Sequence, residues 1–383
     1  MTEDCTNDNI LKGIIRQAKD NPIYKDIYAN VRETDNIFQI PFLEEQHLQM
    51  IDTNDVSKFT EASCVHFTSG TTAEPKAFYR KQEEITYITD YIKELCKIEN
   101  IAGGERVAVL LGQSFWGAGY YTTEGHVKAG NIVTAIDTGL TIESIVQLLQ
   151  SFKPTVISST PSFLASLKGK ISNLNLKILE TTGELLDNQT RRDLETSFKT
   201  KIFDAYGLTE GVIGTECSEH DGYHFLPSKL YLEIINPKTE ELLKEDTWGE
   251  LVMTVLCDSI MPIIRYKTKD ICKISTALCP CGYQSPRIWI KGRKEKFVSL
   301  YEGAKVAYTA ISKTLEEIYG SAMTFSLEIK NNDKMSMMYI NLINADPVKD
   351  EFAKAKIASL NYETLYLTSA GKLHIILFHG EFK

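Results

Sequence analysis

Short apolar runs rich in β-branched residues alternate with helix-like stretches through the middle of the chain, and this alternation most constrains the fold. The helix-like stretch TIESIVQLLQSF, residues 141–152, has apolar side chains at helical spacing. Strand–helix–strand units of this kind predict a parallel sheet covered by helices on both faces. The predicted strands are residues 106–112, 131–137, 154–160, 176–184 and 201–207.

The pattern changes after Gly222. Residues 229–243 and 248–256 read as strands of an antiparallel meander, with a turn at Asn236-Pro237. From about residue 293 a helix, a strand, a second helix and a terminal strand follow one another. This order indicates a small α+β unit after the larger body.

The length of 383 residues allows two or three domains. Apolar residues make up 43% and charged residues 24%, which is an ordinary globular composition. We predict an α/β fold in which a large N-terminal domain, residues 1–292, has mixed and parallel sheets covered by helices plus an antiparallel β region. A small mobile α+β domain, residues 293–383, follows a hinge near Arg293.

Charge and cysteine usage restrict the partners and the compartment. The net charge of -9 repels polyanions and no dense run of Lys and Arg offsets it, so we expect no nucleic-acid partner. The first residues lack a secretory signal pattern, and no stretch approaches the roughly 20 apolar residues of a membrane helix. We therefore expect no membrane partner. Eight scattered cysteines suggest reduced thiols or metal ligands in a cytoplasmic protein.

Residues 66–80, HFTSGTTAEPKAFYR, contain a run of small and hydroxylated residues followed by a lysine. Backbone N–H groups and hydroxyl donors in the run Thr68-Ser69-Gly70-Thr71-Thr72, with Lys76 as a cation, suit a polyphosphate. The Walker A pattern is absent. Taken alone, these residues fit a solvated polar loop equally well.

More motifs follow in chain order: Thr181-Thr182-Gly183-Glu184, Tyr206-Gly207-Leu208-Thr209-Glu210, Tyr266-Lys267-Thr268-Lys269-Asp270, Gly292-Arg293-Lys294-Glu295 and Ser369-Ala370-Gly371-Lys372. With TSGTTAEPK, this ordered set resembles the adenylate-forming superfamily of acyl-CoA synthetases, adenylation domains and luciferases. The stretches NPIYKDIY, IPFLEEQHL and CPCGYQSPRI resemble the phenylacetate–CoA ligase branch. The resemblance spans residues 68 to 372.

The resemblance implies that ATP activates a carboxylic acid to an acyl-AMP, with release of pyrophosphate. The acyl group would then pass to a thiol, either of coenzyme A (CoA) or of the phosphopantetheine arm of a carrier protein. An aryl acid is one option for the small acid substrate, because Phe115 and Trp116 lie between the nucleotide motifs with Gly117 and Gly119. Aromatic residues beside a Gly-rich turn are also common in cores.

The resemblance also assigns roles to residues. Thr209 would contact the α-phosphate, Glu210 would hold Mg²⁺, and Lys372, carried by the C-terminal domain, would stabilise the transition-state charge. Asp270 would accept hydrogen bonds from the ribose. The remaining nucleotide-binding residues would be Thr68, Ser69, Gly70, Thr71, Thr72, Lys76, Gly183, Glu184, Tyr206, Gly207 and Arg293.

Each of these residues also has a structural reading. Asp270 fits a turn after a strand, Glu210 fits the cap of a following helix, and Lys372 fits an exposed lysine that opens a strand. Ala73 and Lys269 stand where the superfamily usually has glycine. These departures, with the unusual tail after Lys372, leave an alternative function: a degenerate nucleotide-binding member without turnover that acts as a binding module.

A metal site is also predicted. Cys279 and Cys281 lie in one tight turn, CPCG, while Cys217 and two histidines lie upstream. Three cysteines and one histidine are a standard ligand set for structural zinc. Resemblance to relatives with the same spacing favours His224 over His220 as the fourth ligand. Two thiols without metal are the alternative.

Overall fold

The structure is a computed structural model of the chain. It describes residues 4–21, 23–32, 37–51, 55–67, 76–101, 103–113, 117–171, 173–293, 297–301, 304–320, 323–332, 334–343, 345–360 and 362–379. Among these residues, no helix is both long and apolar enough to cross a membrane.

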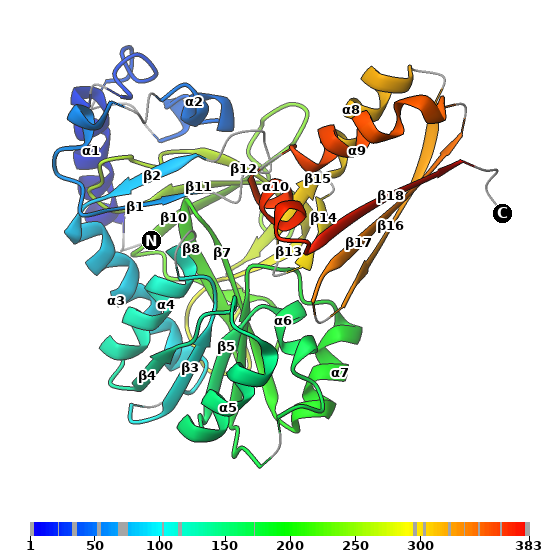
Figure 1. Ribbon diagram of the computed structural model, residues 1–383. Coiled ribbons are helices and arrows are strands. Elements are labelled where there is room, and N and C mark those ends of the chain that lie inside the picture. Colours follow the sequence, from blue (N-terminus) through cyan, green and yellow to red (C-terminus); the bar gives the residue numbers. More distant parts are fainter. Residues whose placement is uncertain are drawn as a thin grey trace.

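An 11-stranded mixed sheet forms the body of the molecule, with the order β10-β11-β12-β13-β9-β8-β7-β6-β5-β3-β4 (Figure 1). Strands β4, β3, β5, β6 and β7 are parallel, and the others pair antiparallel. The predicted parallel and antiparallel regions are therefore parts of one sheet. The bounds are β3 (Arg106–Leu110), β4 (Ile132–Ala135), β5 (Val156–Ser159), β6 (Ile178–Thr182), β7 (Lys201–Leu208), β8 (Gly211–Glu216), β9 (Tyr223–His224), β10 (Leu230–Ile235), β11 (Gly249–Val255), β12 (Tyr266–Ser275) and β13 (Arg287–Arg293).

Helices cover both faces of the parallel part. On β3, Val107 and Val109 pack with Cys96 of α3, whereas Ala108 and Leu110 on the opposite face pack with α5. This alternation follows from the two-residue period of a strand, and it explains why the strands are apolar throughout. The prediction of a sheet covered on both faces is confirmed. The helices are α3 (Gln82–Ile98), α4 (Gly117–Lys128), α5 (Ile142–Phe152), α6 (Pro161–Ser166) and α7 (Asn188–Phe198).

The N-terminal segment packs against the antiparallel side of the sheet. Leu43 pairs with Tyr266 of β12, and its N–H donates to the carbonyl of Arg265 at 3.0 Å. This pairing places the start of the short helix α2 beside β12. The elements are α1 (Asp4–Asp20), η1 (Ile37–Gln39), α2 (Glu45–Gln49), η2 (Val56–Phe59) and a hairpin of β1 (Cys64–Phe67) with β2 (Ala77–Arg80).

The C-terminal segment has a hydrophobic core of its own, made of residues between Val298 and Leu373. It appears in orange and red in Figure 1, beside the main body. Its three-stranded sheet has the order β16-β17-β18, with β17 and β18 parallel. The elements are β14 (Phe297–Ser299), β15 (Lys305–Ala307), α8 (Tyr308–Tyr319), β16 (Thr324–Asn331), β17 (Ser336–Ile343), η4 (Pro347–Lys349), α9 (Asp350–Ala358), α10 (Tyr362–Ser369) and β18 (Leu373–His379).

Candidate active site

A cavity of about 770 Å³ lies where β6 and β7 end, between the parallel and antiparallel parts of the sheet. The carboxyl ends of parallel strands are the usual location of ligand sites in α/β folds. Most of the predicted nucleotide-binding residues that the structure describes meet there. The predicted nucleotide-site residues that line the cavity are Lys76, Gly183, Glu184, Tyr206, Gly207, Thr209, Glu210 and Asp270, and Gly117 from the predicted acid pocket lines it as well.

Thr209 and Glu210 form a two-residue turn between the antiparallel strands β7 and β8. The reading of Glu210 as a helix cap is therefore wrong, because a strand begins at Gly211. Arg80, which is buried, donates from Nη2 to the carbonyl of Thr209 at 2.9 Å and from Nη1 to Glu84 at 3.0 Å. Arg80 thus holds the turn in place, although no motif in the sequence singles it out.

Asp270 is a buried residue of β12 rather than a turn residue. Its carboxylate accepts a hydrogen bond of 2.5 Å from the Tyr206 hydroxyl, and its N–H donates to Thr268 Oγ1 at 3.1 Å. The preceding Lys269 has a φ of 65°. A left-handed backbone explains why glycine suits this position, and here a lysine adopts it at a steric cost.

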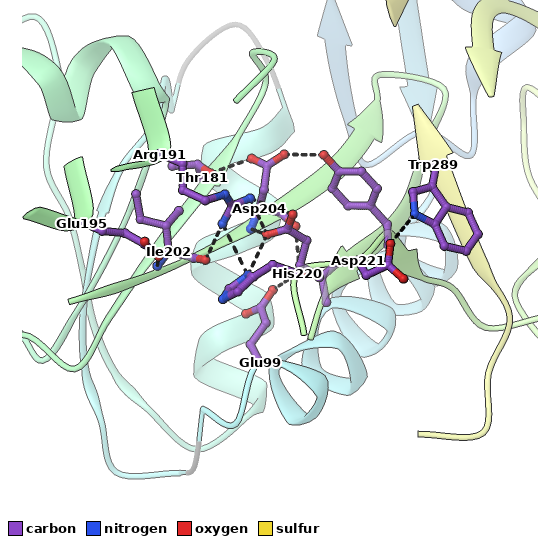
Figure 2. A network of polar contacts seen from close by, with 12 residues as sticks. Glu99, Thr181, Arg191, Glu195, Ile202, Asp204, His220, Asp221 and Trp289 are labelled. Carbon is purple, nitrogen blue, oxygen red and sulfur yellow. Dashed lines mark hydrogen bonds and ion pairs between the residues drawn. The ribbon is translucent and has the colours of Figure 1, made fainter. Parts of the chain in front are cut away.

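The end of β6 supplies a second group of polar contacts. Gly183 has a φ of 83°, which turns the chain away from the sheet, and Glu184 accepts hydrogen bonds from the Ser162 N–H at 3.0 Å and hydroxyl at 2.6 Å. Figure 2 shows Thr181 donating to Asp204, which also accepts from Tyr223. Burial raises the pKa of Asp204 to about 7.

Glu45, at the start of α2, binds two lysines on the rim of the cavity. Its carboxylate lies 2.9 Å from Lys76 Nζ and 2.8 Å from Lys269 Nζ. Burial alone would raise the pKa of Glu45, but the two lysines lower it to about 2. Lys76 Nζ also lies 4.0 Å from Glu210 Oε1. Two cations therefore converge on the end of the cavity where phosphates are expected.

Some predicted site residues are not brought to this cavity. Lys372 lies directly before the last strand, β18, with Nζ 5.4 Å from the centre of the Tyr301 ring, and is not among the lining residues. Gly119 does not line the cavity either, since α4 there lies against the carbonyls of residues 111 and 112. Residues 68–75, including Thr68, Ser69, Gly70, Thr71 and Thr72, lie outside the described part of the chain, as do Phe115, Trp116 and the side chain of Arg293.

The predicted zinc ligands come together beside β9. The candidate ligand atoms of Cys217, His224, Cys279 and Cys281 all lie within 4.8 Å of one another. The Cys217 and Cys279 sulfurs are 3.7 Å apart, and Cys281 Sγ is 3.4 Å from His224 Nε2. A tetrahedral zinc with Zn–S near 2.3 Å and Zn–N near 2.0 Å requires edges of about 3.8 and 3.6 Å. The donor set and its spacing fit such an ion.

The other candidate histidine has different partners. His220 Nδ1 lies 3.3 Å from Glu216, which forms a two-point ion pair with Arg191 (Figure 2). His224, in contrast, directs Nδ1 to Ser285 Oγ at 2.9 Å, which leaves Nε2 facing Cys281. A ring nitrogen held by a second hydrogen bond is typical of a metal-ligating histidine. The structure therefore agrees with His224 as the fourth candidate ligand.

Sequence reasoning missed a polar group that also lines the cavity. Glu99 lies just after α3, His126 is on α4 and Glu180 is on β6, with Cys96 close by. Each residue is isolated in the sequence and belongs to no motif. The available signal was a charged residue inside a predicted strand, as Glu180 is directly after Ile178-Leu179.

The fold and the cavity define a class of protein: an α/β enzyme with a cavity between the parallel and antiparallel parts of a mixed sheet and a smaller C-terminal segment beside the main body. A profile of the family described as "AMP-binding enzyme" matches residues 11–255, and the chain belongs to this family.

Among characterised proteins, the chain is similar to phenylacetate-coenzyme A ligases. The chain is 26% identical over 358 residues to a phenylacetate-coenzyme A ligase of Pseudomonas putida, covering 87% of this chain and 80% of that enzyme. It is 27% identical over 291 residues to one of Aromatoleum evansii, covering 73% and 65%. The predicted superfamily and the enzyme class, an AMP-forming acid–thiol ligase, are confirmed.

A solved structure confirms the fold. A 2-hydroxyisobutyryl-CoA ligase in its thioesterification state, in complex with 2-HIB-AMP and CoA, superposes with a TM-score of 0.81 at 19% identity. The match covers 98% of this chain and 86% of that one. The same ligase in its postadenylation state gives a TM-score of 0.68.

Proposed function

We propose that this enzyme uses ATP to convert a small carboxylic acid to an acyl-AMP and then transfers the acyl group to the thiol of CoA. The observation that carries the proposal is the meeting of Tyr206, Thr209, Glu210 and Asp270 in one cavity. These residues come from two motifs of the superfamily, the first three from residues 206–210 and Asp270 from residues 266–270. CoA is favoured over a carrier-protein arm because the relatives are coenzyme A ligases.

Each end of the nucleotide has a partner in this proposal. Asp270, whose carboxylate is oriented by Tyr206, accepts from the ribose hydroxyls. Thr209 contacts the α-phosphate, and Lys76 neutralises charge on the β- and γ-phosphates together with residues 68–72. Glu210, a buried carboxylate at the cavity wall, fits Mg²⁺ and would hold it against the phosphates, where the ion supplies charge stabilisation.

Lys372 requires movement of the C-terminal part. We propose that residues 1–292 form the adenylation core domain and residues 293–383 a mobile lid, since the lid has a separate hydrophobic core. Rotation near Arg293 would bring Lys372 to the cavity for adenylation. The arrangement described here, with Lys372 away from the cavity, fits the thiol-transfer step.

A structural zinc ion is a further part of the proposal. Cys217, His224, Cys279 and Cys281 would fill all its positions, so the ion would link β9 to the loop before β13 and take no part in the chemistry. Metal analysis of the purified protein should find zinc, and Cys281→Ser should reduce the zinc content and the melting temperature together. Metal-free wild-type protein with unchanged melting would contradict this role.

The activity is tested by pyrophosphate release and hydroxamate trapping over a panel of acids, with and without CoA. We expect pyrophosphate release with some acids and a thioester product when CoA is added. ATP binding without acyl-AMP for every acid would favour the alternative, a degenerate member that acts as a binding module. Lys372→Ala should abolish adenylation but leave transfer from supplied acyl-AMP, which distinguishes the lid lysine from a structural one.

A further inference from the structure

The cavity extends well beyond its nucleotide end. Gly183 marks the end of β6 at the nucleotide site, whereas Glu180 lies three residues earlier, about 10 Å along the strand at roughly 3.3 Å per residue. The Glu180 side chain points to the face covered by α3 and α4, where it meets His126. Apolar side chains also line this cavity: Ile92, Leu95, Leu111 and Ala118.

The far part of the cavity is polar and buried. His126 Nε2 lies 2.9 Å from Glu180 Oε2. The Glu105 N–H donates to Asn131 Oδ1 at 3.1 Å, which fixes the Asn131 amide with its nitrogen 3.3 Å from His126 Nδ1. His126 Nδ1 therefore accepts, and Nε2 carries the proton that is donated to Glu180. The imidazole is fully occupied by these neighbours.

Glu99 is different, because its partners include a second carboxyl group: its side chain shares a hydrogen bond with that of Glu180. It is 3% exposed, and Oε1 accepts from the Thr215 hydroxyl, the contact drawn in Figure 2. Oε2 is buried and accepts no hydrogen bond from any residue that the structure describes. Burial, then the nearby Glu180 carboxylate, raises the pKa of Glu99 well above its ordinary value. His126 lowers the pKa of Glu180 against the opposing effect of burial.

Two adjacent carboxyl groups are a costly lining for a pocket that holds only an apolar acyl chain. Buried carboxyl groups lose hydration, and an apolar side chain of similar size would be as stable or more so. No step of adenylation or thiol transfer involves Glu99 or Glu180. A ligand that donates hydrogen bonds would give this carboxyl pair an additional donor, and a cationic ligand would also balance a second negative charge.

We propose that the acid substrate carries a hydrogen-bond donor, an amino or hydroxyl group, at the end remote from its carboxylate, and that Glu99 and Glu180 accept it. The inference rests on the proposed function, since it places the substrate carboxylate at the nucleotide end of the same cavity. The apolar lining of the cavity then accommodates the carbon skeleton. Glu99 is a specificity residue in this view.

Matched acids test the proposal with the wild-type enzyme. ATP–pyrophosphate exchange is measured for phenylacetate, 4-hydroxyphenylacetate and 4-(aminomethyl)phenylacetate, and for hexanoate, 6-hydroxyhexanoate and 6-aminohexanoate. We expect a donor-bearing acid to exceed its unsubstituted partner by at least about tenfold in kcat/KM, because the unsubstituted acid leaves buried acceptors unpaired. Equal or better activity of the unsubstituted acids in both series overturns this inference alone. No exchange with any acid defeats the proposed function and this inference together.

Variants of Glu99 separate recognition from folding. Glu99→Gln keeps the size of the side chain and the contact with Thr215. It should lower the kcat/KM ratio of the amino-substituted acids to their unsubstituted partners by about tenfold and change the ratio for the hydroxy-substituted acids less. Glu99→Leu should favour the unsubstituted acids. Glu143→Gln, at an exposed position of α5, is the matched control and should change neither. Equal loss for every acid would mean that Glu99 only supports the fold.

A binding measurement removes dependence on turnover. Acyl-sulfamoyl adenosines, which mimic the acyl-AMP, can be prepared with and without the distal amino group and titrated by calorimetry. The wild type should bind the amino analogue at least about tenfold more tightly, and Glu99→Leu should reverse that order. Equal dissociation constants for the two analogues in the wild type would overturn the proposal.

Discussion

Each end of the cavity has a glutamate, and the surroundings shift the pKa values of these two glutamates in opposite directions. At the nucleotide end, Glu45 lies between two lysines, and its pKa falls to about 2 despite partial burial. At the far end, burial and Glu180 raise the pKa of Glu99. Glu45 is therefore a charged group that balances cations, whereas the surroundings of Glu99 disfavour its charged form.

This difference indicates that one cavity can recognise the nucleotide at one end and the variable part of the acid substrate at the other. Under our proposals, the nucleotide end would bind a molecule common to the whole family, and Glu45 there is paired with two lysines of the protein. The far end would bind the part of the substrate that differs between enzymes, and two carboxyl groups there lie next to each other. Changes at the nucleotide end should affect all acids equally, whereas changes at the far end should depend on the acid.

The largest expected effect is on stability at the nucleotide end. Arg80→Met should lower the free energy of unfolding by roughly 3 to 5 kcal/mol, because Glu84 would remain buried without its cation. Urea unfolding at pH 7 measures this loss. Arg192→Met, at an exposed site on α7, should stay within about 0.5 kcal/mol. The double variant Arg80→Met, Glu84→Gln should recover part of the loss; no recovery would contradict the unpaired charge as the cause.

Asp270→Ala should reduce kcat/KM for ATP by about 100-fold, roughly 2.7 kcal/mol, because a charge-assisted hydrogen bond to the nucleotide is lost and the Tyr206 hydroxyl loses its acceptor. Pyrophosphate release with several acids measures it. The factor should be the same for every acid. If the loss of kcat/KM caused by Asp270→Ala differed between acids with different distal groups, the two ends of the cavity would not act independently.

Glu45→Gln should lower the free energy of unfolding at pH 7 by about 1 kcal/mol, a value reduced for solvent screening of this partly exposed group. The pKa of Glu45 is lowered from its ordinary 4.5 to about 2, so the stabilisation is complete above pH 4.5 and disappears as the pH falls toward 2. The difference between wild type and variant should shrink over that range. A difference independent of pH would exclude the lysine pairing as its source.

The smallest expected effect is that of Glu99→Gln, which should raise the free energy of unfolding slightly or leave it unchanged. Because the pKa of Glu99 is raised, its contribution to stability is complete below about pH 4.5 and declines as the pH rises. Glu99→Gln should therefore be neutral or up to about 1 kcal/mol more stable than wild type at pH 7, with the advantage decreasing at lower pH. Unfolding curves at pH 5 and pH 7.5 compare the two. Strong destabilisation at pH 7.5 would show that ionised Glu99 supports the fold.

The nucleotide end could largely be predicted from the sequence, because its residues occur in contiguous motifs whose order is informative. Tyr206 and Asp270 were found in this way. The far end could not, since Glu99, His126 and Glu180 come from three elements that only the tertiary structure brings together. The hairpin that carries Arg80 was also missed, because each of its strands has only four residues. The helix α3 was not predicted either, although its apolar residues recur at helical spacing.

The two-residue strand β9 connects the halves of the large sheet, since it pairs with β8 on one side and β13 on the other. Tyr206 belongs to one half and Asp270 to the other, and their hydrogen bond crosses the junction. His224, a candidate zinc ligand, is one of the two residues of β9. The candidate nucleotide pocket therefore depends on a connection in which β9 forms only two residue pairs with β8 and two with β13. A change that disrupts this pairing should also weaken nucleotide binding.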